Sequence, residues 1–211
     1  MLEKNIQRLK DNALKYLGYN GQLIDDLTLK YLDKGISEIE EIASFKSIYN
    51  KYALNDLKIN NISLDYPDFR ELFKKCNEIM VVGYTLGIDV DRYLKKLSIS
   101  NMTYMIVFDA IASSYLELKA DEYEDSLNLG KRTFRFCPGY GKVPIELNQD
   151  LVKLLDTSKH IGLTIQDSNI FLPQKSMIGL IGLGDNSVKK SCTNCQNYHD
   201  CRFRKAGKTC Y

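Results

Sequence analysis

Apolar residues recur at helical spacing through the first part of the chain. This pattern predicts one helix over residues 1–17 and a second over about 22–44, with the breaker sequence GYNG between them. Residues 46–66 instead alternate apolar and polar side chains around the pair NN, which is typical of a β-hairpin. A proline followed by aspartate suits the first turn of a helix, so we expect a short helix over 67–76.

The rest of the chain mixes strands and helices. The apolar run EIMVVGYTLG predicts a strand over 78–87, the segment IDVDRYLKKL predicts a helix, and a longer helix is expected over about 101–127. Further along, short apolar or β-branched runs predict three strands, at 132–136, 161–166 and 176–183, and a helix lies between the first two at about 146–157. Helices followed by mixed short elements, without regular βαβ alternation, favour an α+β fold around a mainly antiparallel sheet.

The long helix has an apolar and an acidic part. Its apolar side chains fall on one face and are Met105, Phe108, Ala112, Tyr115 and Leu116. Its far end gathers four acids, which are Asp121, Glu122, Glu124 and Asp125. Because charge runs are common on surface helices, the simplest interpretation of the acidic end is a solvated face.

Three familiar ligand-binding motifs are absent. The sequence GLIGLG at 179–184 lies in an apolar strand and precedes a turn, so its glycines indicate close packing or a bend and no dinucleotide site. The sequence GKT near the end has Arg202 where a phosphate-binding loop needs glycine. The cysteine spacing also differs from that of radical S-adenosylmethionine enzymes.

Composition is that of an ordinary globular protein, with 44% hydrophobic and 27% charged residues among 211. No apolar run approaches the roughly 20 residues of a membrane helix, and the N-terminus lacks the apolar centre of a signal peptide, so we expect a cytoplasmic protein without membrane contact. From Val188 onward six Lys or Arg residues face one acid, a balance of +5, which leaves −3 for the remainder of a chain whose net charge is +2. We therefore predict a domain at 1–187, helical over about 1–45, and a distinct tail at 188–211.

The tail carries four of the six cysteines, spaced C-x2-C-x5-C-x8-C. In a reducing compartment this spacing predicts a metal site formed by Cys192, Cys195, Cys201 and Cys210, with His199 as a substitute for the last cysteine. Spacing does not separate zinc, which would be a structural staple, from an iron-sulfur cluster, which would be an electron relay. Only two aromatic residues accompany the basic ones, so a docking patch for an acidic protein fits the tail at least as well as a nucleic-acid site.

The sequence RFCPGY, 135–140, combines several groups suited to a small ligand. Arg135 offers a fork of donors for a carboxylate, and Gly139 lets a ligand approach the main chain. Cys137 precedes a proline and is biased to an extended backbone, and Tyr140 adds a flat face and a hydroxyl. These residues alone leave two interpretations open, a turn with a surface arginine or the edge of a pocket for an amino-acid derivative of a nucleoside.

Residues 135–184 resemble the activation domain of cobalamin-dependent methionine synthase. The matching motifs occur in order: the R-x-x-P-G-Y loop, a helix ending LLD, the segment IGLTIQDS and the strand PQKSMIG. The resemblance extends more weakly back to about residue 80 through VVGYTLGIDVDRYLKKL and FDAIASSYLE.

The resemblance implies a twisted antiparallel sheet with flanking helices that binds S-adenosylmethionine at its edge. It also implies a reaction in which cob(II)alamin is reduced by one electron and trapped by methyl transfer from S-adenosylmethionine. By position, Arg135 would hold the methionyl carboxylate, the backbone at Cys137 and Gly139 would line the adenosyl pocket, and Tyr140, the catalytic assignment, would face the corrin. The implied partners are a cobalamin-binding methionine synthase or corrinoid protein and an electron donor such as flavodoxin or ferredoxin.

The chain departs from the family pattern in several ways, among them Gln166 and Asp167 where the family usually has Thr and Glu. Ser113 aligns near the family's ligand-binding glutamate, and Glu117, one turn on, is the expected substitute. The chain has no D-x-H-x-x-G motif, so the corrinoid must arrive on another protein. The cysteine tail is an addition. Two other functions stay open, a non-catalytic S-adenosylmethionine-binding assembly module with a zinc tail and a basic metal-ribbon protein that binds nucleic acid.

Overall fold

The computed structural model describes residues 3–184, 192, 198–207 and 209. Within them the helices are α1 (Glu3–Tyr16), α2 (Asp26–Ile42), α3 (Pro67–Leu72), α4 (Ile88–Ser100), α5 (Met102–Ser126), α6 (Leu147–Leu155), α7 (Thr157–Ile161) and α8 (Arg202–Lys205). The strands are β1 (Lys46–Ala53), β2 (Lys58–Ile59), β3 (Ile62–Ser63), β4 (Cys76–Thr85), β5 (Thr164–Ile165), β6 (Phe171–Leu172) and β7 (Ser176–Gly184).

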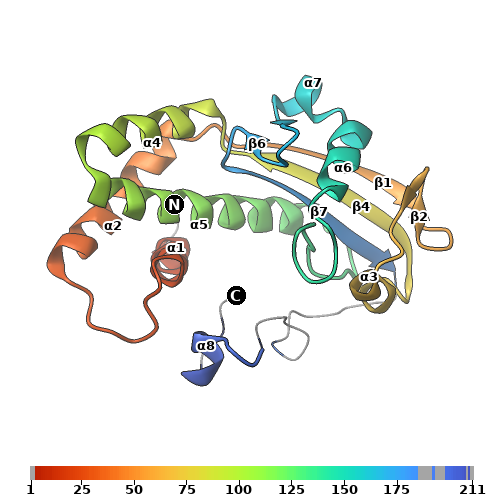
Figure 1. The fold of residues 1–211 in the computed structure, drawn as a ribbon, viewed down its shortest axis with the longest axis horizontal. Coiled ribbons are helices and arrows are strands. Elements are labelled where there is room, and N and C mark those ends of the chain that lie inside the picture. Colours follow the sequence, from red (N-terminus) through yellow and green to blue (C-terminus); the bar gives the residue numbers. More distant parts are fainter. Residues whose placement is uncertain (1–2, 185–191, 193–197, 208, 210–211) are drawn as a thin grey trace.

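Three long strands form the main sheet in the order β1-β4-β7, and both pairings are antiparallel (Figure 1). In the register, Lys46 lies opposite Thr85 and Thr85 lies opposite Ser176. The central strand β4 therefore pairs with one strand that precedes it by some 30 residues and with another that follows it by more than 90. This arrangement confirms the predicted α+β class with an antiparallel sheet.

The central strand is buried on both faces. Met80, Val82 and Tyr84 belong to a core shared with α1, α2, α4 and α5, whereas Ile79 and Val81 belong to a second core with α3, α6 and α7. Successive side chains of a strand point to opposite faces, so helices on both sides require apolar residues at consecutive positions. This explains the uninterrupted apolar run in the sequence of β4.

The helices on the first face form a bundle around α5, the longest helix (Figure 1). Its N-cap, Asn101, accepts a hydrogen bond from the backbone N–H of Tyr104 at 3.0 Å. Glu38 of α2 joins the bundle, because one of its oxygens accepts bonds from the hydroxyls of Tyr93 in α4 and Tyr104 in α5 at 2.7 and 2.6 Å. Three helices are thus fixed to one another by a single carboxylate.

Two predictions about strands were wrong in part, one in its pairing and one in its extent. Residues 46–66 do not form one hairpin, because β1 pairs with β4, and the local hairpin is the short β2–β3 pair around Asn60–Asn61. The backbone at Asp56 and Leu57 has positive φ and turns the chain away from β1. The strand expected at 161–166 is instead the end of α7, a turn at Gly162 and the two-residue β5.

The segment 132–136 runs beside β7 without forming a regular strand. It is joined to β7 by isolated bridges, Arg132 opposite Leu183 and Phe136 opposite Leu180. Between them the hydroxyl of Thr133 accepts the backbone N–H of Gly182 at 2.9 Å, in place of a backbone carbonyl. A side-chain acceptor within the ladder explains why the regular strand pattern is interrupted here.

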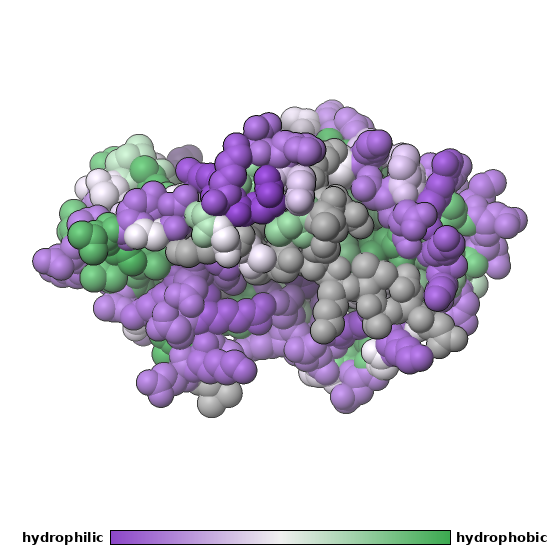
Figure 2. All heavy atoms as spheres, turned by 90° about the horizontal axis from the view of Figure 1, so that it is seen from below, coloured by the Kyte–Doolittle hydropathy of each residue, from purple (hydrophilic) through white to green (hydrophobic). Residues whose placement is uncertain are grey.

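The boundary predicted at residue 187 lies outside the described residues, so the division into domain and tail stays a prediction. No described helix combines the length and the apolar character needed to span a bilayer. Seen from below, the surface is mainly hydrophilic, with apolar residues in small groups (Figure 2).

Candidate functional site

The loop after Arg135 is anchored at both ends. Phe136 exchanges two backbone hydrogen bonds of 2.9 Å with Leu180 of β7. On the far side, the backbone N–H of Lys142 donates to Asp68 of α3 at 2.7 Å, and the backbone N–H of Gly139 donates to the carbonyl of Val143 at 3.0 Å. Because its ends are bound to β7 and to α3, the loop has a defined position at the edge of the sheet.

A glycine of β7 makes room for the arginine. A Cβ atom placed on Gly179 would lie 2.6 Å from Cγ of Arg135 and 2.9 Å from its Cδ, closer than real side chains approach. The aliphatic part of Arg135 therefore lies directly across the strand at this position. The glycines of GLIGLG serve close packing, as expected from the sequence, and Gly182 likewise accommodates Cys76.

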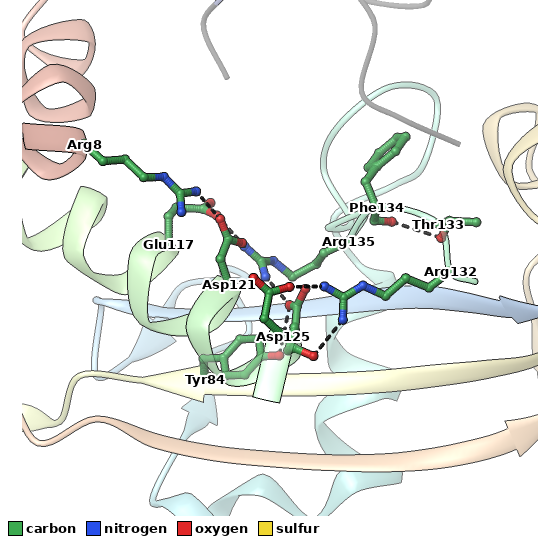
Figure 3. Close-up of polar contacts among 10 residues, drawn as sticks. Arg8, Tyr84, Glu117, Asp121, Asp125, Arg132, Thr133, Phe134 and Arg135 are labelled. Atoms are coloured by element: carbon green, nitrogen blue, oxygen red, sulfur yellow. Dashed lines mark hydrogen bonds and ion pairs between the residues drawn. The ribbon is translucent and has the colours of Figure 1, made fainter. Parts of the chain in front are cut away.

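The guanidinium of Arg135 is held by three carboxylates from one face of α5 (Figure 3). Nη1 pairs with Glu124, and Nη2 pairs with Glu117 at 2.5 Å and with Asp121 at 3.1 Å. These acids are spaced i, i+4 and i+7 along the helix, which places them in a row. The Arg135 side chain is only 4% exposed.

Burial and charge act against each other in this group. Burial disfavours the charged form of Arg135, but its three carboxylates outweigh that effect and raise the pKa of the guanidinium above its ordinary value. Burial raises the pKa of Glu124, which Arg135 and the Tyr84 hydroxyl counteract. Tyr84, on the central strand, donates to Glu124 at 3.0 Å, and burial followed by the Glu124 charge raises its pKa, so it remains a donor.

The acidic end of α5 is therefore not simply a solvated face. Glu124 is 5% exposed as a residue, and Asp121 pairs with both Arg135 and Arg8 of α1. Arg132 pairs with Asp125 at 2.6 Å and donates to the backbone carbonyl of Glu124 at 2.7 Å. The interpretation from charge alone was wrong because these acids meet arginines that come from other parts of the sequence.

The other loop residues predicted for the site lie at its outer side. Tyr140 is 71% exposed. Gly139 has a φ of +93°, which favours glycine, and Ile145 would lie 3.4 Å from a Cβ placed there. Cys137 is half-buried, with its sulfur near Gly179. The structure thus brings Arg135 and Glu117 into contact and places Cys137, Gly139 and Tyr140 on the adjoining loop.

Tyr16, like the partners of Arg135 other than Glu117, was missed from the sequence as a residue of the site. Partial burial and the charge of Glu117, together with Tyr140 and Cys137, raise the pKa of Tyr16 to about 12, with Arg135 acting in the opposite direction. Tyr16 ends α1, and the residue is 57% exposed. The helix that carries it lies outside the stretch covered by the family resemblance, and its sequence offered no signal beyond an aromatic residue at a helix end.

Ser113 lies one turn from Glu117 and has its own partner. Its hydroxyl accepts a hydrogen bond from Nζ of Lys175 at 2.8 Å, and Lys175 also pairs with Asp109 at 2.8 Å. An ammonium group of the chain itself therefore occupies the surroundings of Ser113. Glu117, not Ser113, is the residue that meets Arg135.

The cysteine tail is described only in part. Cys192 and Cys201 are half-buried, whereas Cys195 and Cys210 lie outside the described residues. Among the residues with described positions, no three His, Cys, Asp or Glu side chains form a group that could hold a metal ion. Arg202 of α8 lies against Gly18, just after α1, and Arg204 stacks on Tyr198 at 4.1 Å. The four-cysteine metal site stays a prediction.

Comparison with known proteins finds a similar fold in a solved structure, but no similar sequence. No protein-family model and no curated protein sequence matches this chain. A solved structure described as the MetH reactivation domain bound to AdoHcy matches with a TM-score of 0.63 at 14% sequence identity. The match covers 97% of this chain and 84% of the other. The chain therefore has the fold of a MetH reactivation domain, as the resemblance in the sequence implied.

Proposed function

We propose that this chain binds S-adenosylmethionine beside the 135–140 loop and reactivates cobalamin carried by a separate methionine synthase or related corrinoid protein. One observation carries the proposal: over nearly its whole length the chain shares the fold of a reactivation domain that was solved with AdoHcy. In support, the first residue of the R-x-x-P-G-Y loop, Arg135, lies in contact with Glu117 of the long helix.

The groups at the loop fit an amino-acid head group joined to a nucleoside. Arg135 offers the donors for a carboxylate, and Glu117 offers the acceptor for an ammonium. Gly139 is exposed and has no side chain, so a flat ring can lie against its main chain on the side away from Ile145. Tyr140 is exposed and in a position to meet the corrin of a docked partner.

In the proposed reaction the chain positions one substrate against another. The partner's cob(II)alamin gains one electron from a donor such as flavodoxin or ferredoxin, the methyl group passes from sulfur to cobalt, and the leaving group is S-adenosylhomocysteine. Arg135, Glu117 and the loop backbone hold the methyl donor, and Tyr140 lies on the side open to the partner. Because methyl transfer removes the reduced cobalt, it draws the unfavourable reduction forward.

In this proposal the cysteine tail binds a metal ion or an iron-sulfur cluster. Cys192, Cys195, Cys201 and Cys210 supply four thiolates, a complete ligand set for zinc or for an iron-sulfur cluster. A bound cluster would supply one-electron chemistry, whereas zinc would stabilise the tail. Purification under anaerobic conditions, with metal analysis and an absorption spectrum, separates the two: a brown chromophore supports the electron relay and colourless zinc supports the staple.

Calorimetric titration with S-adenosylmethionine tests the binding step. Wild type should bind, Arg135→Gln should not, and Arg132→Gln, which removes a neighbouring arginine that pairs with Asp125, should bind as wild type does. Absence of binding by the folded wild type would overturn the proposal. A cob(II)alamin-loaded methyltransferase with a reductant then tests reactivation, followed by the spectrum of methylcobalamin, with Tyr140→Ala slower than Tyr140→Phe.

A further inference from the structure

Arg135, which we propose binds the carboxylate of a ligand, is already paired with carboxylates of the protein. They differ in exposure: the Glu124 side chain is 7% exposed, whereas the side chains of Glu117 and Asp121 are 37% and 34% exposed. A ligand that arrives from solvent can therefore exchange with Glu117 or Asp121 but not with Glu124. Nη1 of Arg135 stays paired inside the protein, and Nη2 faces the exchangeable side.

Glu117 is the acid best placed to leave. Asp121 is also held by Arg8 of α1, so it has a second cation. Among the residues described by the structure, Arg135 is the one cation that pairs with Glu117. When Glu117 moves, it loses one contact, and Asp121 keeps both of its arginines.

An amino-acid head group is complementary to the pair of Arg135 and Glu117, because it has a carboxylate for the first and an ammonium for the second. If the carboxylate of the ligand replaces Glu117 on Nη2 of Arg135, the released Glu117 can accept a hydrogen bond from the ammonium of the ligand. The pair between Arg135 and Glu117 is then replaced by two ion pairs with the ligand, and no charge is left unpaired. A ligand with a carboxylate but no ammonium would release Glu117 beside the site without a partner. Leaving a partly buried charge unpaired is costly, so the site discriminates against such a ligand.

We propose that Glu117 is a specificity-determining residue that closes the unliganded site on Arg135 and opens it only to zwitterionic amino-acid head groups. The inference rests on the proposed function, because it concerns the same ligand site. It adds that one carboxylate has two opposite effects, since it attracts the ammonium of the correct ligand and competes with the carboxylate of any ligand.

These opposite effects make the test specific. S-adenosylhomocysteine and its deaminated analogue, which keeps the carboxylate, are titrated calorimetrically into wild type and Glu117→Gln. We expect Glu117→Gln to bind S-adenosylhomocysteine about tenfold more weakly, because a charge-assisted hydrogen bond is lost. The same variant should bind the deaminated analogue more tightly than wild type does, because Arg135 is no longer closed by a carboxylate.

Glu122→Gln is the matched control. Glu122 lies on the same helix with a side chain 35% exposed, but it pairs with Lys119 and Asn5 instead of Arg135. The control removes the same charge, and neither affinity should change. If Glu117→Gln weakens both ligands or changes neither, the inference is overturned and the proposed function stands. If wild type binds neither S-adenosylmethionine nor S-adenosylhomocysteine, the proposed function is overturned and the inference falls with it.

Discussion

Arg135 and Glu124 form an ion pair in which both side chains are almost completely buried, 4% and 7% exposed. The two residues connect the edge of β7 to the last turns of α5. Tyr84 connects the central strand β4 to the same group, because its hydroxyl donates to Glu124. Removal of one member of a buried pair leaves the other charge uncompensated, which costs more than the pair itself contributes. The pair is therefore a sensitive point for both stability and binding.

Glu124→Ala should lower the free energy of unfolding by about 3 kcal/mol, the low end for a broken buried pair, because Glu117 and Asp121 remain on Arg135. Asp125→Ala, at the next position, should cost less than about 1 kcal/mol, since Asp125 is 75% exposed in its pair with Arg132. Urea denaturation monitored by circular dichroism measures both. Equal losses in the two variants would contradict the buried role of Glu124.

Gly179→Ala should destabilise the protein by about 1–3 kcal/mol, because the new methyl group would overlap the side chain of Arg135. It should also weaken binding of S-adenosylmethionine, since the guanidinium must move. Gly83→Ala, on the neighbouring strand, is the comparison. Its Cβ would meet methyl groups at 3.1 and 3.2 Å, which can yield, so its effect on both measurements should be smaller.

Asp68→Ala should loosen the candidate ligand loop by removing the acceptor for the N–H of Lys142. We expect a stability loss of about 1 kcal/mol and weaker binding of S-adenosylmethionine, with recovery in Asp68→Asn, which keeps an oxygen acceptor. Asp65→Ala, which breaks an exposed pair with Arg70, should leave binding unchanged. A loop that binds equally well without Asp68 would show that the anchor has no part in the site.

Glu38 should make stability depend on acid pH. Burial acts to raise its pKa, but hydrogen bonds from Tyr104 and Tyr93 and the charge of Lys34 outweigh burial and hold the pKa below its ordinary value of 4.5. A depressed folded-state pKa gives stability that is present above that value and is lost as pH falls through the folded pKa. Urea midpoints at neutral and acid pH should therefore differ less in Glu38→Gln than in wild type. The exposed Glu41→Gln should keep the wild-type pH dependence.

Cys201→Ser should reduce the metal bound per chain, since it removes one of four proposed ligands. Cys76→Ser is the control, because Cys76 packs beside Gly182 and is not one of the four proposed ligands. Metal analysis of protein purified without oxygen measures both. Retention of the full metal content by Cys201→Ser would contradict the predicted ligand set.

Much of the fold was predictable because local patterns determine it. The helix expected over 101–127 is α5, at 102–126, and the apolar run at 78–87 is β4, at 76–85. Strand pairing was harder, since β1 joins a strand some 30 residues away, and alternation along a strand does not say which partner it meets.

The ion pairs of the site were missed although one signal was available. Phe108, Ala112 and Leu116 lie on a row of α5 at intervals of four residues, and two further steps lead through Ala120 to Glu124. A carboxylate that continues a buried row requires a buried cation. The identity of that cation, Arg135, follows from the path of the chain beside β7, which residue spacing does not reveal.

The contacts between α1 and α5 have a consequence for biosynthesis. Asp121 meets Arg8 across 113 residues and Glu122 meets Asn5 across 117. A 14-residue helix has little stability alone, so α1 leaves the ribosome long before the surface that stabilises it exists. The candidate site, with Tyr16 at one side and the 135–140 loop at the other, is therefore assembled late in synthesis.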